Sequence, residues 1–120
     1  MRDFSVFEYC YCDASNYKAW GSLLLRGATT NAAVKLLRNQ FGSECYFIAE
    51  QLCIPPLYSE LWAFTSGPAA DDHVWHTFHA LRPASVRDIK APVFGSLGNL
   101  VQKVKAVKAW DETLSPHWGI

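Results

Sequence analysis

Two β-prone runs near the start of the chain, separated by a short turn segment, constrain the fold more than any other feature. Residues 4–12 (FSVFEYCYC) are rich in aromatic residues, valine and cysteine, and residues 20–26 (WGSLLLR) form the second run. Between them, Asp13, Ser15 and Asn16 favour a turn, because their side chains can hydrogen-bond to their own backbone. We therefore predict an antiparallel hairpin, which breaks the regular strand–helix alternation of a doubly wound parallel sheet.

Capping signals and apolar spacing predict two helices. The first spans residues 31–41, with capping oxygens before it and Gly42 where a left-handed residue commonly ends a helix. The second begins after Ser96, and its apolar residues follow a 3.6-residue period: Leu97, Leu100, Val101, Val104 and Val107.

Residues 73–81 (HVWHTFHAL) are predicted to form a further strand. Strand alternation places His76 and Ala80 on one face and His79 and Leu81 on the other. Both faces are mixed in polarity, which indicates a strand with one fully and one partly covered side.

The middle of the chain carries shorter signals. Residues 45–48 are β-prone, and Pro56 suits the first position of a short helix through Trp62. The order of the elements predicts a single compact α+β domain over residues 1–120, with an antiparallel sheet of about four strands and two main helices packed on one face.

The composition excludes several classes of protein. With 120 residues, 50% of them hydrophobic, the chain can bury a core without metals or disulfides and is too apolar for disorder. Charges interrupt it too often for a membrane span, and a net charge of zero argues against a nucleic-acid binder. The first residues lack the apolar run of a signal peptide, so we expect a cytoplasmic protein.

The zero net charge conceals two blocks of opposite sign. Residues 44–72 hold five acidic residues and no lysine or arginine, whereas residues 82–108 hold six basic residues and one acid. We expect these blocks to face each other or to lie on opposite surfaces, although a one-sign patch could also attract a partner.

Four cysteines, Cys10, Cys12, Cys45 and Cys53, are expected to be free thiols in a reducing compartment. A four-cysteine zinc site is the alternative, but neither pair has the two-to-four-residue spacing usual for structural zinc. We therefore predict no metal and no cofactor.

Potentially reactive side chains gather at Asp72, His73 and His76. Histidine titrates near neutral pH and its neutral ring binds metals, so these residues are candidates for ligand binding, metal binding or acid–base chemistry. Half-buried histidines beside Trp75 and Phe78 in a strand are the simpler explanation. Moreover, His73 and His76 point to opposite faces of a strand.

The segment after the first strand is a second candidate ligand site, with Asp13, Asn16 and Tyr17 able to line a polar pocket mouth. Turn stabilisation is the alternative explanation for these residues. No catalytic residue is predicted, because the chain lacks the nucleophile elbow, zinc-protease and phosphate-loop motifs.

Several short segments resemble a group of small uncharacterised bacterial proteins, some of them carried on mobile gene cassettes such as those of integrons. The resemblance rests on residues 11–21 (YCDASNYKAWG), 54–58 (IPPLY), 72–76 (DHVWH) and 115–118 (SPHW). It implies a bacterial cytosolic origin and carries no activity to any residue.

Together these features predict a non-enzymatic binding or interaction module that forms a homodimer through surplus aromatic surface, or that binds an unidentified protein or small-molecule ligand. A small enzyme or metal-binding protein using Asp72, His73 and His76 is the alternative. Most of the 17 aromatic residues occupy core-like positions, and three are singled out for exposure: Trp75, Trp110 and Trp118.

Overall fold

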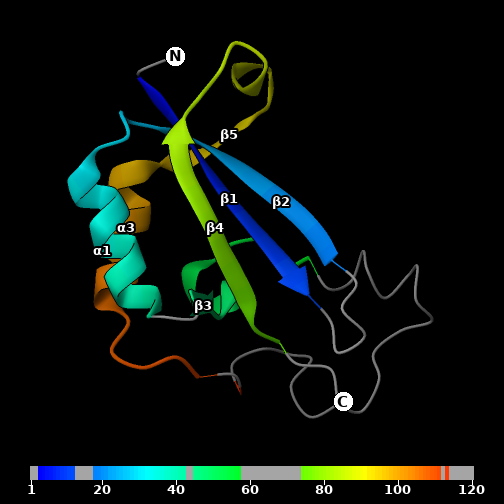
Figure 1. Cartoon of the computed structure of the whole chain (residues 1–120), viewed down its shortest axis with the longest axis vertical. Coiled ribbons are helices and arrows are strands. Elements are labelled where there is room, and N and C mark those ends of the chain that lie inside the picture. The colour runs from blue at the N-terminus through cyan, green and yellow to red at the C-terminus, as the bar shows by residue number, and fades with distance from the viewer. Residues whose placement is uncertain (1–2, 13–17, 43–44, 58–73, 112, 114–120) are drawn as a thin grey trace.

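The computed structural model describes residues 3–12, 18–42, 45–57, 74–111 and 113 (Figure 1). In chain order the elements are β1 (Phe4–Cys12), β2 (Lys18–Arg26), α1 (Asn31–Phe41), β3 (Tyr46–Phe47), the 3₁₀ helix η1 (Ala49–Leu52), β4 (His76–Pro83), the 3₁₀ helix η2 (Asp88–Lys90), β5 (Val93–Ser96) and α3 (Leu97–Ala106). The strands form one sheet in the order β3-β4-β1-β2-β5. The predicted α+β class is confirmed.

The first two strands form the predicted hairpin at the centre of the sheet. β1 pairs antiparallel with β2 from Phe4 opposite Arg26 to Cys12 opposite Lys18, and its other edge pairs antiparallel with β4. A strand with partners on both edges pairs most of its backbone groups inside the sheet, which suits the apolar character of β1.

The predicted all-antiparallel sheet of about four strands is wrong in one detail. Residues Val93–Ser96 form a fifth strand, β5, which pairs parallel with β2. The strand is only four residues long, and its last residue, Ser96, is also the N-cap of α3 and accepts a hydrogen bond from the backbone of Asn99. A strand this short shows no recognisable alternation of apolar and polar residues. The sequence therefore indicated only the helix that follows it.

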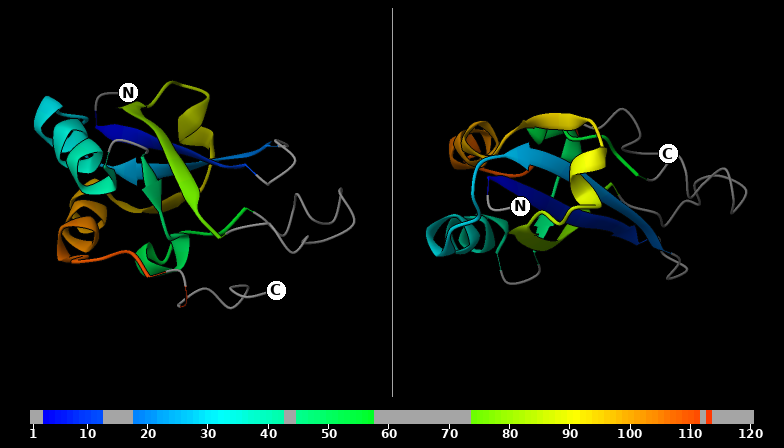
Figure 2. Two further views of the ribbon diagram at one scale, coloured as in Figure 1. Left: turned by 60° about the horizontal axis from the view of Figure 1, so that its bottom comes forward. Right: turned by 90° about the horizontal axis from the view of Figure 1, so that it is seen from above.

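Both main helices pack on the same face of the sheet, as predicted (Figure 2). The inner side of β1 contributes Phe7, Tyr9 and Tyr11 to one core cluster that also contains Leu37 of α1 and Val104 of α3. Thr30 caps α1 by accepting a hydrogen bond from Ala33, and Gly42 follows the helix with a φ of 78°. The sequence signals for both ends of α1 are thus confirmed.

A bulge changes the predicted alternation of β4. Glu8 pairs with Ala80, but the next residue of β1, Tyr9, pairs with Phe78, so that His79 is an additional residue in the ladder. Because the side-chain period of a strand is two, one additional residue reverses the faces that follow it. Leu81 therefore joins the inner core with Phe78, and the predicted faces of Ala80 and Leu81 are wrong.

The segment between α1 and β4 is less regular than predicted. β3 is two residues long, and η1 follows it. The short helix predicted from Pro56 to Trp62 falls mostly outside the described residues, and its first positions are not helical. None of the helices in the described ranges combines the length and apolar character required to cross a bilayer.

Candidate functional site

The helices cover one side of the sheet and leave part of the other side accessible. Because successive strand residues point to opposite faces, Glu8 and Cys10 face away from the helices, opposite Ser22 and Trp20 of β2. We call this side the open face and define it by nine residues of β1, β2 and β4: Glu8, Cys10, Cys12, Lys18, Trp20, Ser22, Thr77, His79 and Arg82. The neighbouring Val6 and Leu24 form a small second core together with Ala84.

An exposed aromatic pair marks the open face. The side chain of Trp20 is 56% exposed, and its ring meets the ring of His79 edge to face, with centroids 5.2 Å apart and planes at 81°. His79 lies at the bulge of β4, on the face that strand alternation predicted for it. A hollow of about 340 Å³ lies here, lined by Glu8, Trp20, Gly21, Ser22 and His79.

A second hollow, of about 570 Å³, lies on the same side between β2 and the segment that leads into β5. Its lining combines Leu24 and Val93 with the exposed Phe94 and with Arg87. Ser22 lines both hollows, so the two adjoin on one surface.

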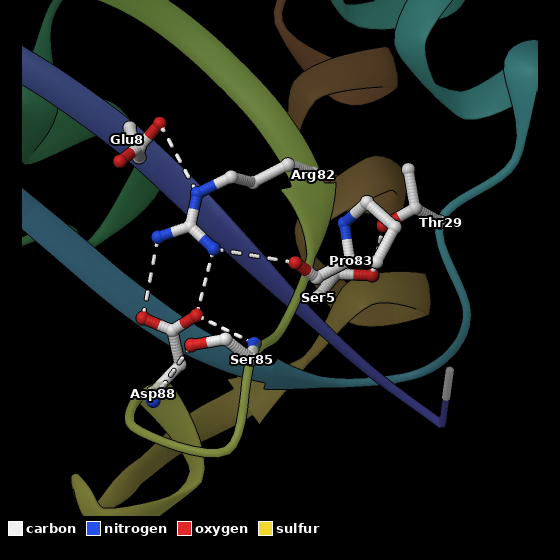
Figure 3. Close-up of polar contacts among 7 residues, drawn as sticks. All are labelled: Ser5, Glu8, Thr29, Arg82, Pro83, Ser85 and Asp88. Atoms are coloured by element: carbon white, nitrogen blue, oxygen red, sulfur yellow. Dashed lines mark hydrogen bonds and ion pairs between the residues drawn. The ribbon is translucent and has the colours of Figure 1, made fainter. Parts of the chain in front are cut away.

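An ion-pair network fixes η2 over this surface (Figure 3). Arg82 donates to both carboxylate oxygens of Asp88, at 2.7 and 3.2 Å, and its Nε lies 3.4 Å from Glu8 Oε1. The backbone N–H of Ser85 also donates to Asp88 at 2.6 Å. The hydrogen bonds from Arg82 lower the pKa of Asp88, and Asp88 in turn raises the pKa of Arg82. Both groups are therefore held in their charged forms at neutral pH.

The cysteines do not converge on a common point. All four are free, and Cys10 is buried whereas Cys53 is exposed. Burial raises the pKa of the Cys10 thiol, although the nearby Lys18 acts in the opposite direction. Across the described ranges, no three histidine, cysteine or acidic side chains are close enough to hold one metal ion.

Of the side chains predicted to bind a ligand, the structure describes only His76, and it lies in the core. The ring is 0% exposed and lies between 5 and 6.5 Å from the rings of Tyr9, Tyr11 and Phe47, centroid to centroid. Its Nε2 accepts a hydrogen bond of 2.9 Å from the backbone N–H of Leu57. This bond requires an unprotonated Nε2, so His76 anchors the chain after Pro56 while its ring is neutral. The other predicted ligand residues lie outside the described ranges: Asp13, Asn16, Tyr17, Asp72 and His73.

The exposed aromatic residues of the described ranges, Trp20, Tyr46 and Phe94, are not among the three singled out from the sequence. Trp75 is half-buried beside Tyr46, and Trp110 is half-buried against Phe41 with its indole N–H donating to Gln40 O. Trp118 lies outside the described residues. The sequence does contain an indication that Trp20 is exposed. In a strand Trp20 shares a face with the polar Ser22, opposite the face of the apolar Leu23.

The two charge blocks are described unequally. Among the five acids of residues 44–72, only Glu50 lies in the described residues, so their placement relative to the basic block stays a prediction. Within the basic block, Arg82 is paired with Asp88, as Figure 3 shows.

Comparisons of the chain with protein-family models, with curated proteins and with solved structures find no match.

Proposed function

We propose that the protein is a non-enzymatic interaction module whose open face binds a second copy of the same chain. The observation that carries the proposal is the exposure of Trp20 and Phe94, 56% and 40%, on one surface beside two adjoining hollows. Large aromatic side chains are enriched at protein interfaces, where they bury much area at little cost in side-chain entropy.

The charges of the surface support self-association. In a two-fold symmetric contact the same patch meets itself, so the patch must contain groups of both signs or it repels its copy. The surface carries Glu8 and Asp88 together with Lys18, Arg82 and Arg87.

The shape of the hollows favours a macromolecular partner over a small ligand. Sites for small molecules usually enclose most of the ligand surface. Here two shallow hollows adjoin along the sheet instead. The ion-paired Arg82 and Asp88 serve a structural role, and the buried Cys10 keeps its proton, which supports a binding role rather than a catalytic one. The four free cysteines support a reducing compartment, so the proposal includes a cytoplasmic location.

Analytical ultracentrifugation tests this proposal. We expect a monomer–dimer equilibrium in the micromolar range and a weakening of about ten-fold or more in Trp20→Ala, since an interface anchor contributes about 1.4 kcal/mol or more. Tyr46→Ala is the matched control, because Tyr46 is 43% exposed but lies on β3 at the far edge of the sheet.

A strict monomer at about 100 μM would overturn the dimer, and an equal loss in both variants would overturn its assignment to the open face. A monomer whose melting temperature rises with a small metabolite, by an amount that depends on Trp20, would instead identify the open face as a small-molecule site.

A further inference from the structure

The two main helices carry charge of one sign only. Across α1 and α3 there is no aspartate or glutamate, and basic side chains occur at four positions, with a fifth directly after α3. We call these five the basic helical layer: Lys35, Arg38, Lys103, Lys105 and Lys108. All five are exposed, and none forms an ion pair within the part of the chain that the structure describes.

Two acids of the described residues, Glu50 and Asp111, lie close to this layer in the chain. Glu50 belongs to η1 and is half-buried, and Asp111 accepts hydrogen bonds from the backbone and hydroxyl of Thr113. Because the five basic side chains are exposed and form no ion pair within the described residues, their positive charges add, and such a field attracts anionic partners.

A hollow of about 560 Å³ lies between the helices, which run side by side at the outside of the molecule (Figures 1 and 2). Lys35 of α1 and Lys105 of α3 both line it, and Leu36, half-buried, adds an apolar surface. Gln40 holds the two helices together, since its Nε2 donates to Val104 O at 3.0 Å and to Val107 O at 3.3 Å. The hollow is therefore a groove of fixed width with lysines from both helices and an apolar contact.

We propose that this groove docks an acidic amphipathic helix of a partner protein. A third helix can place apolar residues against Leu36 while its carboxylates meet Lys35 and Lys105. The lining contains no aromatic side chain on which a base could stack, so the groove fits a protein segment better than a nucleic acid. A second copy of the layer is excluded as the occupant, because two surfaces of the same sign repel each other.

Fluorescence anisotropy with the full chain and defined probes tests this inference. The main probe is a labelled helical peptide of about 18 residues, or five turns, with leucine on one face and glutamate on the other. A peptide with lysine in place of glutamate and a single-stranded oligonucleotide are the comparison probes. We expect only the acidic peptide to bind well and its binding to weaken as salt is raised.

Two double variants with the same change in net charge separate the groove from the overall charge. Lys35→Glu/Lys105→Glu is expected to weaken peptide binding at least about ten-fold, since it reverses two charges at the contact. Arg87→Glu/Lys90→Glu alters exposed residues of the segment around η2 and is expected to change binding by less than about three-fold. All four residues are exposed, so circular dichroism should show an unchanged fold.

Equal weakening in the two double variants, or no binding of the acidic peptide, would overturn the inference. Tighter binding of the oligonucleotide, lost in the groove variant alone, would also overturn it and would identify a nucleic-acid surface. Trp20→Ala should leave peptide binding unchanged, which keeps this test independent of the proposed dimer.

Discussion

The two sides of β1 show how one strand serves two different purposes. On the inner side Phe7, Tyr9 and Tyr11 are at most 2% exposed, and the Tyr9 hydroxyl donates to Pro55 O at 2.6 Å. On the open side Glu8 takes part in an ion pair with Arg82 and lines the hollow beside Trp20. The inner side is thus fixed by close packing and buried hydrogen bonds, whereas the open side leaves area available for a partner.

Substitutions at two histidines of β4, one on each side of the sheet, test this difference between the two sides most directly. We expect His76→Ala to lower the free energy of unfolding by about 3 kcal/mol or more, because it leaves a cavity and removes the acceptor of the buried Leu57 N–H. His79→Ala, three residues later and exposed, should cost about 0.5 kcal/mol or less. Urea unfolding of both variants measures the difference, and similar losses would show that the two sides do not differ as described.

Two glycines provide a second pair of positions at which close packing and open space can be compared. A Cβ at Gly21 would lie 2.9 Å from Leu57 Cδ2 and 3.0 Å from the ring of Tyr9, which its hydroxyl anchors to Pro55. Gly21→Ala should therefore destabilise the protein by about 1–3 kcal/mol through overpacking.

Gly98, in α3, is the matched position, because a Cβ there meets nothing within 4 Å. Gly98→Ala should stabilise the protein by about 0.5 kcal/mol, since alanine is the better helix former. Thermal melts of the two variants should shift in opposite directions. A shift in the same direction would contradict the close packing inferred at Gly21.

A smaller effect than at His76 or Gly21 is expected in the ion-pair network of the open side. Arg82 lowers the pKa of Asp88 in the folded state, so the carboxylate stabilises the fold at every pH above its unfolded pKa of about 3.9. Asp88→Asn should cost about 1 kcal/mol at pH 7, because the pair is partly exposed and solvent screens it.

This cost should shrink as the pH falls below about 4, because Asp88 of the unfolded chain takes up a proton there while Arg82 still keeps the folded carboxylate charged. Asp3→Asn, at an exposed carboxylate outside the network, serves as the control. A cost for Asp88→Asn that stays constant between pH 7 and pH 3 would exclude a contribution from its charge.

The sequence predicts local structure well and long-range structure less well. The hairpin of β1 and β2 and both caps of α1 follow from turn residues, Thr30 and Gly42, whose effects are local. β5 forms by pairing with β2, which lies about 70 residues earlier in the chain. The four residues of β5 alone contain no pattern that predicts this pairing.

The candidate site depends on a similar long-range feature. Trp20 and His79 meet across β1, so their contact depends on the pairing of β2 and β4 with β1, and the residues of β4 alone do not specify that pairing. In contrast, the basic helical layer is visible in the sequence as lysines and arginines without acids in two predicted helices, but the groove between them requires the packing of α1 against α3.

The strand order β3-β4-β1-β2-β5 also has a consequence for synthesis on the ribosome. β1 and β2 are made first and can pair at once, but the other edge of β1 waits for β4, which begins more than sixty residues after β1 ends. At translation rates of about 5–20 residues per second, this delay lasts several seconds. During that time the nascent hairpin presents an unpaired edge with Phe7, Tyr9 and Tyr11 on one side, an apolar surface of the kind that makes nascent chains prone to aggregation.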